Sequence, residues 1–209
     1  MRLYPSLAVL AVIALYWLVK IKTGKKTVDK PIKVAAVSAA STELQRLTQY
    51  ANAAKLFARR NKFDTGYCFL VDMKLPCGSN RFFVFDMQQD AVLESGLVTH
   101  GYGKSSSSKI NFSNIPGSNS TSLGRYKVGG AYMGKFGLAY KLHGLDSTNS
   151  NALNRFVVLH SHECVPSAEV TPQTICMSQG CPTVAPLFLS TLKTYIEKKE
   201  RPVLLWIFY

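Results

Sequence analysis

The chain has 209 residues, of which 47% are hydrophobic, enough for one domain with a sizeable core plus an appended segment and too few for two full domains. Lysine and arginine number 25 against 12 acidic residues, giving a net charge of +13 that favours an anionic partner. The sequence has neither Cys/His finger spacing nor an aromatic-basic RNA-binding motif, so a membrane or an envelope polymer fits better than nucleic acid.

The N-terminus begins with an uncharged apolar stretch, residues 3–19, which reaches the lower limit of length for a membrane-spanning helix. Aromatic residues near both ends of the stretch suit the two membrane interfaces. We predict an uncleaved transmembrane anchor over residues 1–21, with a cleaved signal peptide as the alternative because the apolar core is short. The lysines that follow favour a cytoplasmic domain, whereas an envelope polymer as partner requires the opposite orientation.

The elements that follow the anchor indicate one mainly β domain. A basic stalk (residues 22–38) leads into a helix predicted over residues 41–60, with Ser41 as its N-cap. We expect the domain itself to occupy residues 63–209, after a stalk and helix over residues 22–62. Short apolar runs punctuated by Gly, Pro and Asn predict strands from residue 66 onward. A Ser-rich loop (104–122), a helix (183–198) and an apolar final strand complete the domain.

The segment SQGCPTV (178–184) carries the strongest chemical signal. Gly180 permits a tight approach of the backbone, and Pro182 is favoured in the first turn of a helix. Cys181 is therefore predicted at a helix N-terminus, where the helix dipole stabilises a thiolate. The amides of Gly180 and Cys181 would face a developing oxyanion. The alternative is a small buried cysteine, which is the usual role of a free thiol.

A second signal lies in RFVVLHSHECV (155–165), where an apolar strand ends at His160. A histidine at the rim of a domain is suited to accept the proton of Cys181, and Ser161 is available to orient the imidazole. His162 points the same way along an extended backbone and is the alternative base. A structural histidine remains the simpler explanation of either residue alone.

The remaining cysteines admit a metal site or disulfides. A zinc site would use residues His160, His162, Cys164, Cys176 and Cys181, but H-x-H-x-C followed by C-x4-C fits no common closed zinc site. Disulfides between Cys164 and Cys176 and between Cys68 and Cys77 explain the same residues better in an oxidising compartment. This pairing leaves Cys181 as the odd thiol, although the sequence does not establish the connectivity.

Together, these motifs resemble the active-site signature of the murein L,D-transpeptidase (YkuD-like) catalytic domain. The resemblance extends from about Phe63 to the C-terminus. Its ordered segments are VDMKLPCGSNRFFVFD (71–86), THGYG (99–103), NFSNIPGSNSTSLGRY (111–126), residues 132–161 and SQGCPTV (178–184). The chain departs from many members by carrying Gln179 for a His and Pro182 for an Arg, and by a longer interval between His160 and Cys181.

The resemblance implies a β-sandwich-like domain with a catalytic groove. The residues that it assigns to the site are the nucleophile Cys181, the base His160, the neighbouring Ser161 and, in the oxyanion loop and groove, Ser178, Gly180, His143 and Gly144. The cysteine would attack the carbonyl of a diaminopimelate residue in a tetrapeptide stem, release D-Ala and form a thioester. An amine of a second stem would then complete a 3→3 cross-link, with no metal or cofactor.

The expected location is the bacterial inner membrane, with a single-pass anchor and the catalytic domain in the periplasm. Peptidoglycan stem peptides are the expected partners, and the oligomeric state is left open. Three alternatives remain at this stage. Water would resolve the acyl-enzyme in an L,D-carboxypeptidase or hydrolase. A cysteine peptidase or amidase would act on other substrates. A non-catalytic envelope-binding module would use Cys181 only structurally.

Overall fold

The computed structural model describes residues 34–103, 110–198 and 200–209. The anchor predicted for residues 1–21 and most of the predicted stalk lie outside the described residues, as does part of the Ser-rich loop (104–109). Within the described ranges, no helix is both long and apolar enough to cross a membrane. Thr42–Tyr209 forms a compact unit of its own, and it contains the strands, helix α3 and the part of helix α2 from residue 42 onward.

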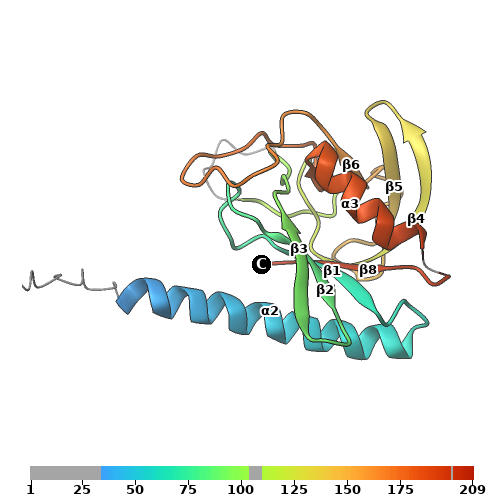
Figure 1. Cartoon of the computed structure of the whole chain (residues 1–209). Helices are drawn as coiled ribbons and strands as arrows, with labels where there is room; N and C mark the ends of the chain where they lie inside the picture. Colours follow the sequence, from blue (N-terminus) through green and yellow to red (C-terminus); the bar gives the residue numbers. More distant parts are fainter. Residues whose placement is uncertain (1–33, 104–109, 199) are drawn as a thin grey trace, which may run out of the picture. The chain divides into compact units, whose positions relative to one another are not determined.

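Eight strands form one mixed sheet, which confirms the prediction of a mainly β domain (Figure 1). The strands are β1 (Tyr67–Asp72), β2 (Phe82–Asp86), β3 (Ala91–Gly96), β4 (Gly124–Gly134), β5 (Gly137–Gly144), β6 (Val158–Ser161), β7 (Thr183–Val184) and β8 (Leu204–Phe208). Their order across the sheet is β3-β2-β1-β8-β4-β5-β6-β7. The pairs β1–β8 and β6–β7 are parallel, and the other neighbours are antiparallel.

The two edges of this sheet are joined by the chain that leaves β3. Val98 forms an antiparallel bridge with Val184 of β7, and the Thr99 amide donates to the Thr183 carbonyl at 2.9 Å. The segment that follows β3 therefore pairs with β7, and we call this junction the seam. The resemblance implied a β-sandwich-like domain, and the described strands belong to one continuous mixed sheet with apolar clusters packed on it.

Helix α2 (Val34–Arg60) begins earlier than predicted, so Ser41 lies inside the helix and is not its N-cap. The preceding residues are rich in alanine, the best helix former, which explains the extension. Leu47, Ala51, Ala54 and Ala58 lie on one face of the helix and are buried against the sheet. Residues 42–60 are thus an integral part of the folded domain.

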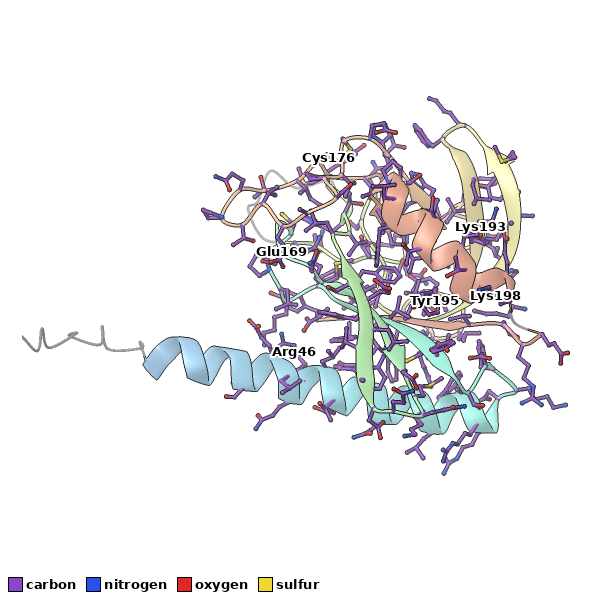
Figure 2. The ribbon with its side chains drawn as sticks, in the orientation of Figure 1. Arg46, Glu169, Cys176, Lys193, Tyr195 and Lys198 are labelled. Atoms are coloured by element: carbon purple, nitrogen blue, oxygen red, sulfur yellow. A yellow bond between two sulfur atoms is a disulfide. The ribbon has the colours of Figure 1, made fainter. Side chains whose placement is uncertain are left out.

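Strands β1 and β8 are covered on both faces, which explains their nearly continuous burial. Cys68 and Leu70 pack toward α2, whereas their neighbour Phe69 enters the main core beneath helix α3 (Pro186–Glu197). At the edge of the α2 interface, Arg46 (labelled in Figure 2) forms an ion pair with the buried carboxylate of Asp72 at 2.7 Å.

The helix predicted over residues 183–198 begins later in the structure than the sequence suggested. Thr183 and Val184 form strand β7 beside β6, because these β-branched residues pair in register with His160 and Ser161. Helix α3 begins only at Pro186. Cys181 is therefore not at a helix N-terminus, and the predicted stabilisation of its thiolate by the helix dipole was wrong.

Candidate active site

Strand β6 delivers His160 to the seam between the two sheet edges. Its Nδ1 lies 3.0 Å from the Ser161 carbonyl, which accepts only, so Nδ1 carries the hydrogen. Ser161, the residue predicted to orient the imidazole, thus contacts it through its main-chain carbonyl. Burial is the main cause that lowers the pKa of His160, so the ring is neutral at pH 7. Nε2 then holds a lone pair, which is the form required of a general base.

Cys181 lies in the turn that precedes β7. Its sulfur is 3.7 Å from the Phe156 carbonyl, in the geometry of a weak hydrogen bond. Burial raises the pKa of the Cys181 thiol, although the nearby Arg155 charge opposes this effect. In the resting structure, the sulfur is consequently a protonated thiol that needs a base to become a nucleophile.

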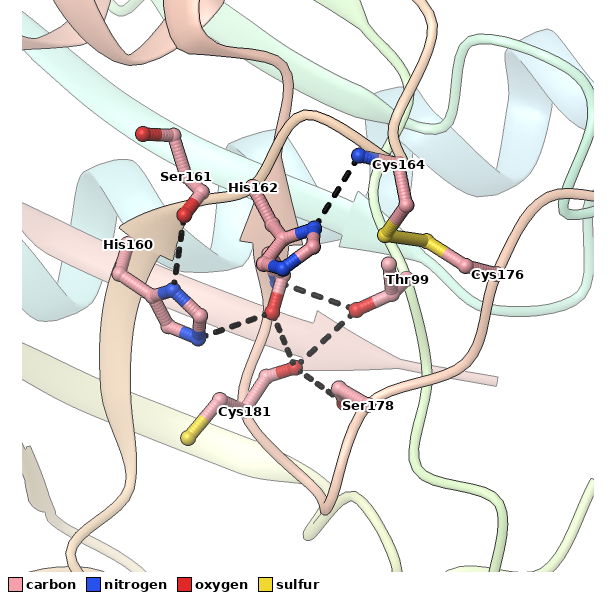
Figure 3. Close-up of a disulfide and its surroundings, with 9 residues drawn as sticks. Thr99, His160, Ser161, His162, Cys164, Cys176, Ser178 and Cys181 are labelled. Atoms are coloured by element: carbon pink, nitrogen blue, oxygen red, sulfur yellow. Dashed lines mark hydrogen bonds between the residues drawn. A yellow bond between two sulfur atoms is a disulfide. The ribbon is translucent and has the colours of Figure 1, made fainter. Parts of the chain in front are cut away.

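The turn is held by hydroxyl groups that converge on the carbonyl of Cys181 (Figure 3). Ser178 Oγ donates to this carbonyl at 2.6 Å and Thr99 Oγ1 at 3.2 Å. Ser178 Oγ also accepts from the Gly180 amide at 3.1 Å, so the predicted oxyanion donor is engaged within the turn. Gly180 has a φ of 111°, and a Cβ there would lie 2.7 Å from the Ser120 carbonyl oxygen. Only glycine fits this position without strain.

Two cavities meet at His160 and Cys181. The larger, about 440 Å³, is also lined by Tyr102, Met177 and Thr183. The smaller, about 190 Å³, lies against the β4–β5 hairpin and is lined by aromatic residues that include Phe156.

Phe136 at the tip of the β4–β5 hairpin covers the imidazole of His160. The two rings stack with centroids 5.2 Å apart and an interplanar angle of 17°. Phe136 also meets His162 edge-on at 5.4 Å, and it borders both cavities. This contact shields one face of the imidazole from water.

The alternative base, His162, occupies a different position. Its Nδ1 accepts the Cys164 amide at 3.1 Å, and its ring lines only the larger cavity. His160, by contrast, borders both cavities together with Cys181. The geometry therefore favours His160 over His162.

A disulfide joins Cys164 and Cys176, as predicted, and forms one wall of the larger cavity (Figure 3). These two residues are thereby removed from any zinc site. Across the described ranges, no three His, Cys, Asp or Glu side chains are grouped to hold a metal ion. The predicted bond between Cys68 and Cys77 was wrong, since both thiols are free. Cys68 packs toward α2, whereas Cys77 packs against a separate apolar cluster.

The structure places the predicted groove residues His143 and Gly144 on β5, apart from the residues that line either cavity around Cys181. His143 is the register partner of Lys127 on β4. A Cβ at Gly144 would lie 1.9 Å from the Asn149 carbonyl oxygen, so this glycine allows the following turn to pack closely. Their position does not support a direct role in the groove.

Sequence inspection missed Arg155, which holds the loop next to Cys181. Its guanidinium donates to the carbonyls of Ser113 at 2.8 Å and Ser120 at 2.6 Å, and to the hydroxyls of Ser118 and Ser122. The Ser120 carbonyl in turn faces Gly180. Arg155 thus connects the Ser-rich loop to the nucleophile turn, through partners too distant in sequence for any local signal.

The sequence matches the family described as the L,D-transpeptidase catalytic domain over residues 38–206. The chain therefore belongs to this family, which confirms the resemblance inferred from its motifs. A search of curated proteins found no significant match.

Three solved structures resemble the chain at low identity. The Ldtfm–avibactam carbamoyl enzyme has 13% identity and a TM-score of 0.41, over 69% of this chain and 49% of its own. The helical cell shape determining protein Pgp2 from Campylobacter jejuni has 11% identity and a TM-score of 0.42, over 68% and 46%. An L,D-transpeptidase from Xylanimonas cellulosilytica has 12% identity and a TM-score of 0.37, over 68% and 60%. The chain thus spans about half the length of the first two.

Proposed function

We propose that the protein is a cysteine acyltransferase of peptidoglycan stem peptides that forms 3→3 cross-links. The family membership supports the class of reaction. The observation that carries the proposal is the pair of cavities that both include His160 and Cys181 in their linings. Two cavities allow a donor stem and an acceptor stem to reach the same sulfur in turn.

In the first half-reaction, His160 Nε2 takes the proton of the Cys181 thiol as the sulfur attacks the carbonyl of the diaminopimelate residue. The C–S bond forms and the carbonyl becomes an oxyanion beside the Ser178–Cys181 turn. Collapse of this intermediate breaks the C–N bond, and His160 returns the proton to the departing D-Ala amine. A thioester remains on Cys181.

In the second half-reaction, the side-chain amine of another diaminopimelate residue attacks the thioester. His160 accepts a proton from this amine, an amide bond forms and the C–S bond breaks. The sulfur recovers its proton from His160, so the enzyme ends in its starting state. Water in place of the amine would make the protein an L,D-carboxypeptidase.

We further propose a single-pass protein of the bacterial inner membrane, anchored by residues 1–21, with its catalytic domain in the periplasm. The disulfide between Cys164 and Cys176 supports an oxidising compartment, where such bonds persist. Fusion of a periplasm-active reporter to the C-terminus tests this orientation, and a reporter active only in the cytoplasm would overturn it.

The reaction is tested by incubating the full chain with purified disaccharide-tetrapeptide and following protein and products by mass spectrometry. The matched variant is Cys181→Ala. We expect an acyl adduct on Cys181, D-Ala release and a cross-linked dimer. An adduct with tripeptide and no dimer would point to the carboxypeptidase. The absence of adduct and D-Ala from a folded protein would favour a non-catalytic envelope-binding module.

A further inference from the structure

A third cavity, of about 480 Å³, lies beside the catalytic cavity. Tyr102 and Met177 line both, so a ligand that extends from Cys181 past these two side chains enters it directly. Both shared side chains are exposed, at 46% and 58%. The third cavity is otherwise lined by the strand-end turn after β1, the His100–Gly101 backbone and part of the segment before Met177.

His100 lines this cavity, and its contact with Arg81 determines which ring nitrogen carries the hydrogen. Arg81 is fully buried, and its guanidinium donates to the Val98 carbonyl through Nε at 3.0 Å and Nη2 at 2.7 Å. Nη2 also lies 3.0 Å from His100 Nδ1. Because an arginine can only donate, Nδ1 must accept, and the hydrogen of the neutral ring is on Nε2. His100 therefore has its N–H group at Nε2, on the ring of a residue that lines the cavity.

The charged side chain among the described lining residues is the positive Lys74. Burial, aided by the adjacent Arg81, lowers the pKa of His100 to about 4, so the ring is neutral at neutral pH. Lys74 lines the same cavity, and Asn111 adds an amide. None of the described lining residues is acidic. The carboxylate of Asp72, which precedes the lining residues Met73 and Lys74 in the chain, is bound by Arg46 and by the Lys74 amide.

We propose that this cavity, defined by Lys74, His100 and Asn111, binds a free carboxylate of a peptide stem whose reacting carbonyl lies at Cys181. The proposal rests on the proposed function and adds the place where the unreacted part of the stem is held. A carboxylate accepts from an N–H donor and pairs with an ammonium group, which are the groups that His100 and Lys74 supply.

Cys77 provides a reporter inside the cavity. It is one of the lining residues and carries a free thiol, whereas Cys68 is fully buried and Cys164 and Cys176 are joined. In a full-length Cys181→Ala variant, Cys77 is the one partly exposed thiol among the five cysteines. Its rate of alkylation by N-ethylmaleimide then measures whether the cavity is occupied, without any catalytic turnover. A Cys77→Ser variant identifies the signal.

We expect the tetrapeptide stem to slow alkylation of Cys77, and a stem with amidated carboxyl groups to give little protection. Lys74→Met should raise the stem concentration needed for protection by about tenfold or more, as loss of a charge-assisted hydrogen bond does. Lys127→Met, on β4 outside this cavity, is the matched control and should leave protection unchanged.

Calorimetric titration of the same Cys181→Ala protein separates the possible failures. Stem binding with an unchanged rate of Cys77 alkylation would overturn the carboxylate cavity and leave the proposed function standing. Equal protection by the free and amidated stems would also overturn it. If the stem does not bind at all and the wild-type chain forms no acyl adduct, the proposed function fails and the cavity assignment fails with it.

Discussion

His160 Nε2 lies 3.0 Å from Thr183 Oγ1, so in the resting structure the base is engaged by a hydroxyl group. Since Nδ1 donates to the Ser161 carbonyl, Nε2 accepts this hydrogen bond from Thr183. Thr183 Oγ1 is also 3.5 Å from the carbonyl of Cys181. Proton transfer from the thiol to Nε2 therefore requires the imidazole to exchange the Thr183 hydroxyl for the Cys181 thiol.

This contact predicts the behaviour of a Thr183→Val variant, which removes the hydroxyl and preserves the shape. A hydrogen bond to the neutral imidazole opposes its protonation, so its loss should raise the pKa of His160. The acid limb of kcat/KM is then expected to move to higher pH. Thr183→Ser keeps the hydroxyl and should retain the wild-type limb. An unchanged limb in Thr183→Val would contradict this role for Thr183.

The choice between the two histidines is tested by acylation rates. His160→Asn should lose about 10²–10⁴-fold in the rate of thioester formation, the usual contribution of a general base. His162→Asn should retain most of this rate, because His162 Nδ1 is committed to the Cys164 amide. Single-turnover mass spectrometry measures both. A larger loss in His162→Asn than in His160→Asn would reverse the assignment.

The pH dependence of the wild-type enzyme follows from the lowered pKa of His160. A base whose pKa lies below the ordinary value of about 6.5 stays neutral, and active, to a lower pH than a free histidine. Activity should therefore be lost only as the pH falls through this depressed pKa. A profile of kcat/KM against pH measures the midpoint, and a midpoint above the free-histidine value would contradict the prediction.

Arg155 is expected to support both stability and reactivity. Arg155→Met removes donors to Ser113, Ser118 and Ser120, and should lower the free energy of unfolding by roughly 2–3 kcal/mol. It should also raise the pKa of the Cys181 thiol, because a stabilising charge is lost. Denaturant unfolding and the pH dependence of Cys181 alkylation measure the two effects. Arg155→Lys should preserve the charge effect but lose the forked hydrogen bonds.

Removal of the disulfide between Cys164 and Cys176 should change the wall of the larger cavity without displacing Cys181. The bond closes a segment with a sequence separation of 12, so Cys164→Ser with Cys176→Ser should cost about 2–3 kcal/mol of stability. We expect a lower Tm and a higher KM, with Cys181 still alkylated at the wild-type rate. A normal KM would mean that this wall does not contact the substrate.

The sequence predicted the strand-rich domain and one of the two disulfides, and it singled out His160 and Cys181, which line the same two cavities, because each depends on local patterns or on the family motif. It failed at residues 183–184, where apolar spacing resembled a helix. The pairing of Thr183 with His160 decides that segment, and this contact joins positions far apart in the sequence. Helix propensity could not reveal it.

Two further failures have a similar physical cause. Proximity in sequence suggested a bond between Cys68 and Cys77, but strand alternation turns Cys68 toward α2. Arg155 looked like an ordinary charged residue before a strand, because its partners on the Ser-rich loop are 33 to 42 residues away. The sequence alone does not show which distant residues will accept hydrogen bonds from the guanidinium of Arg155.

The bridge between Val98 and Val184 also has a consequence for the order of folding. This contact spans a long stretch of chain, and long-range contacts form late because loop-closure entropy opposes them. We therefore expect His160 and Cys181 to come together only when the seam closes, so that base-assisted acylation of the cysteine begins late in folding. Pulsed amide exchange at Thr99 and Thr183 during refolding tests this, and early protection of either amide would contradict it.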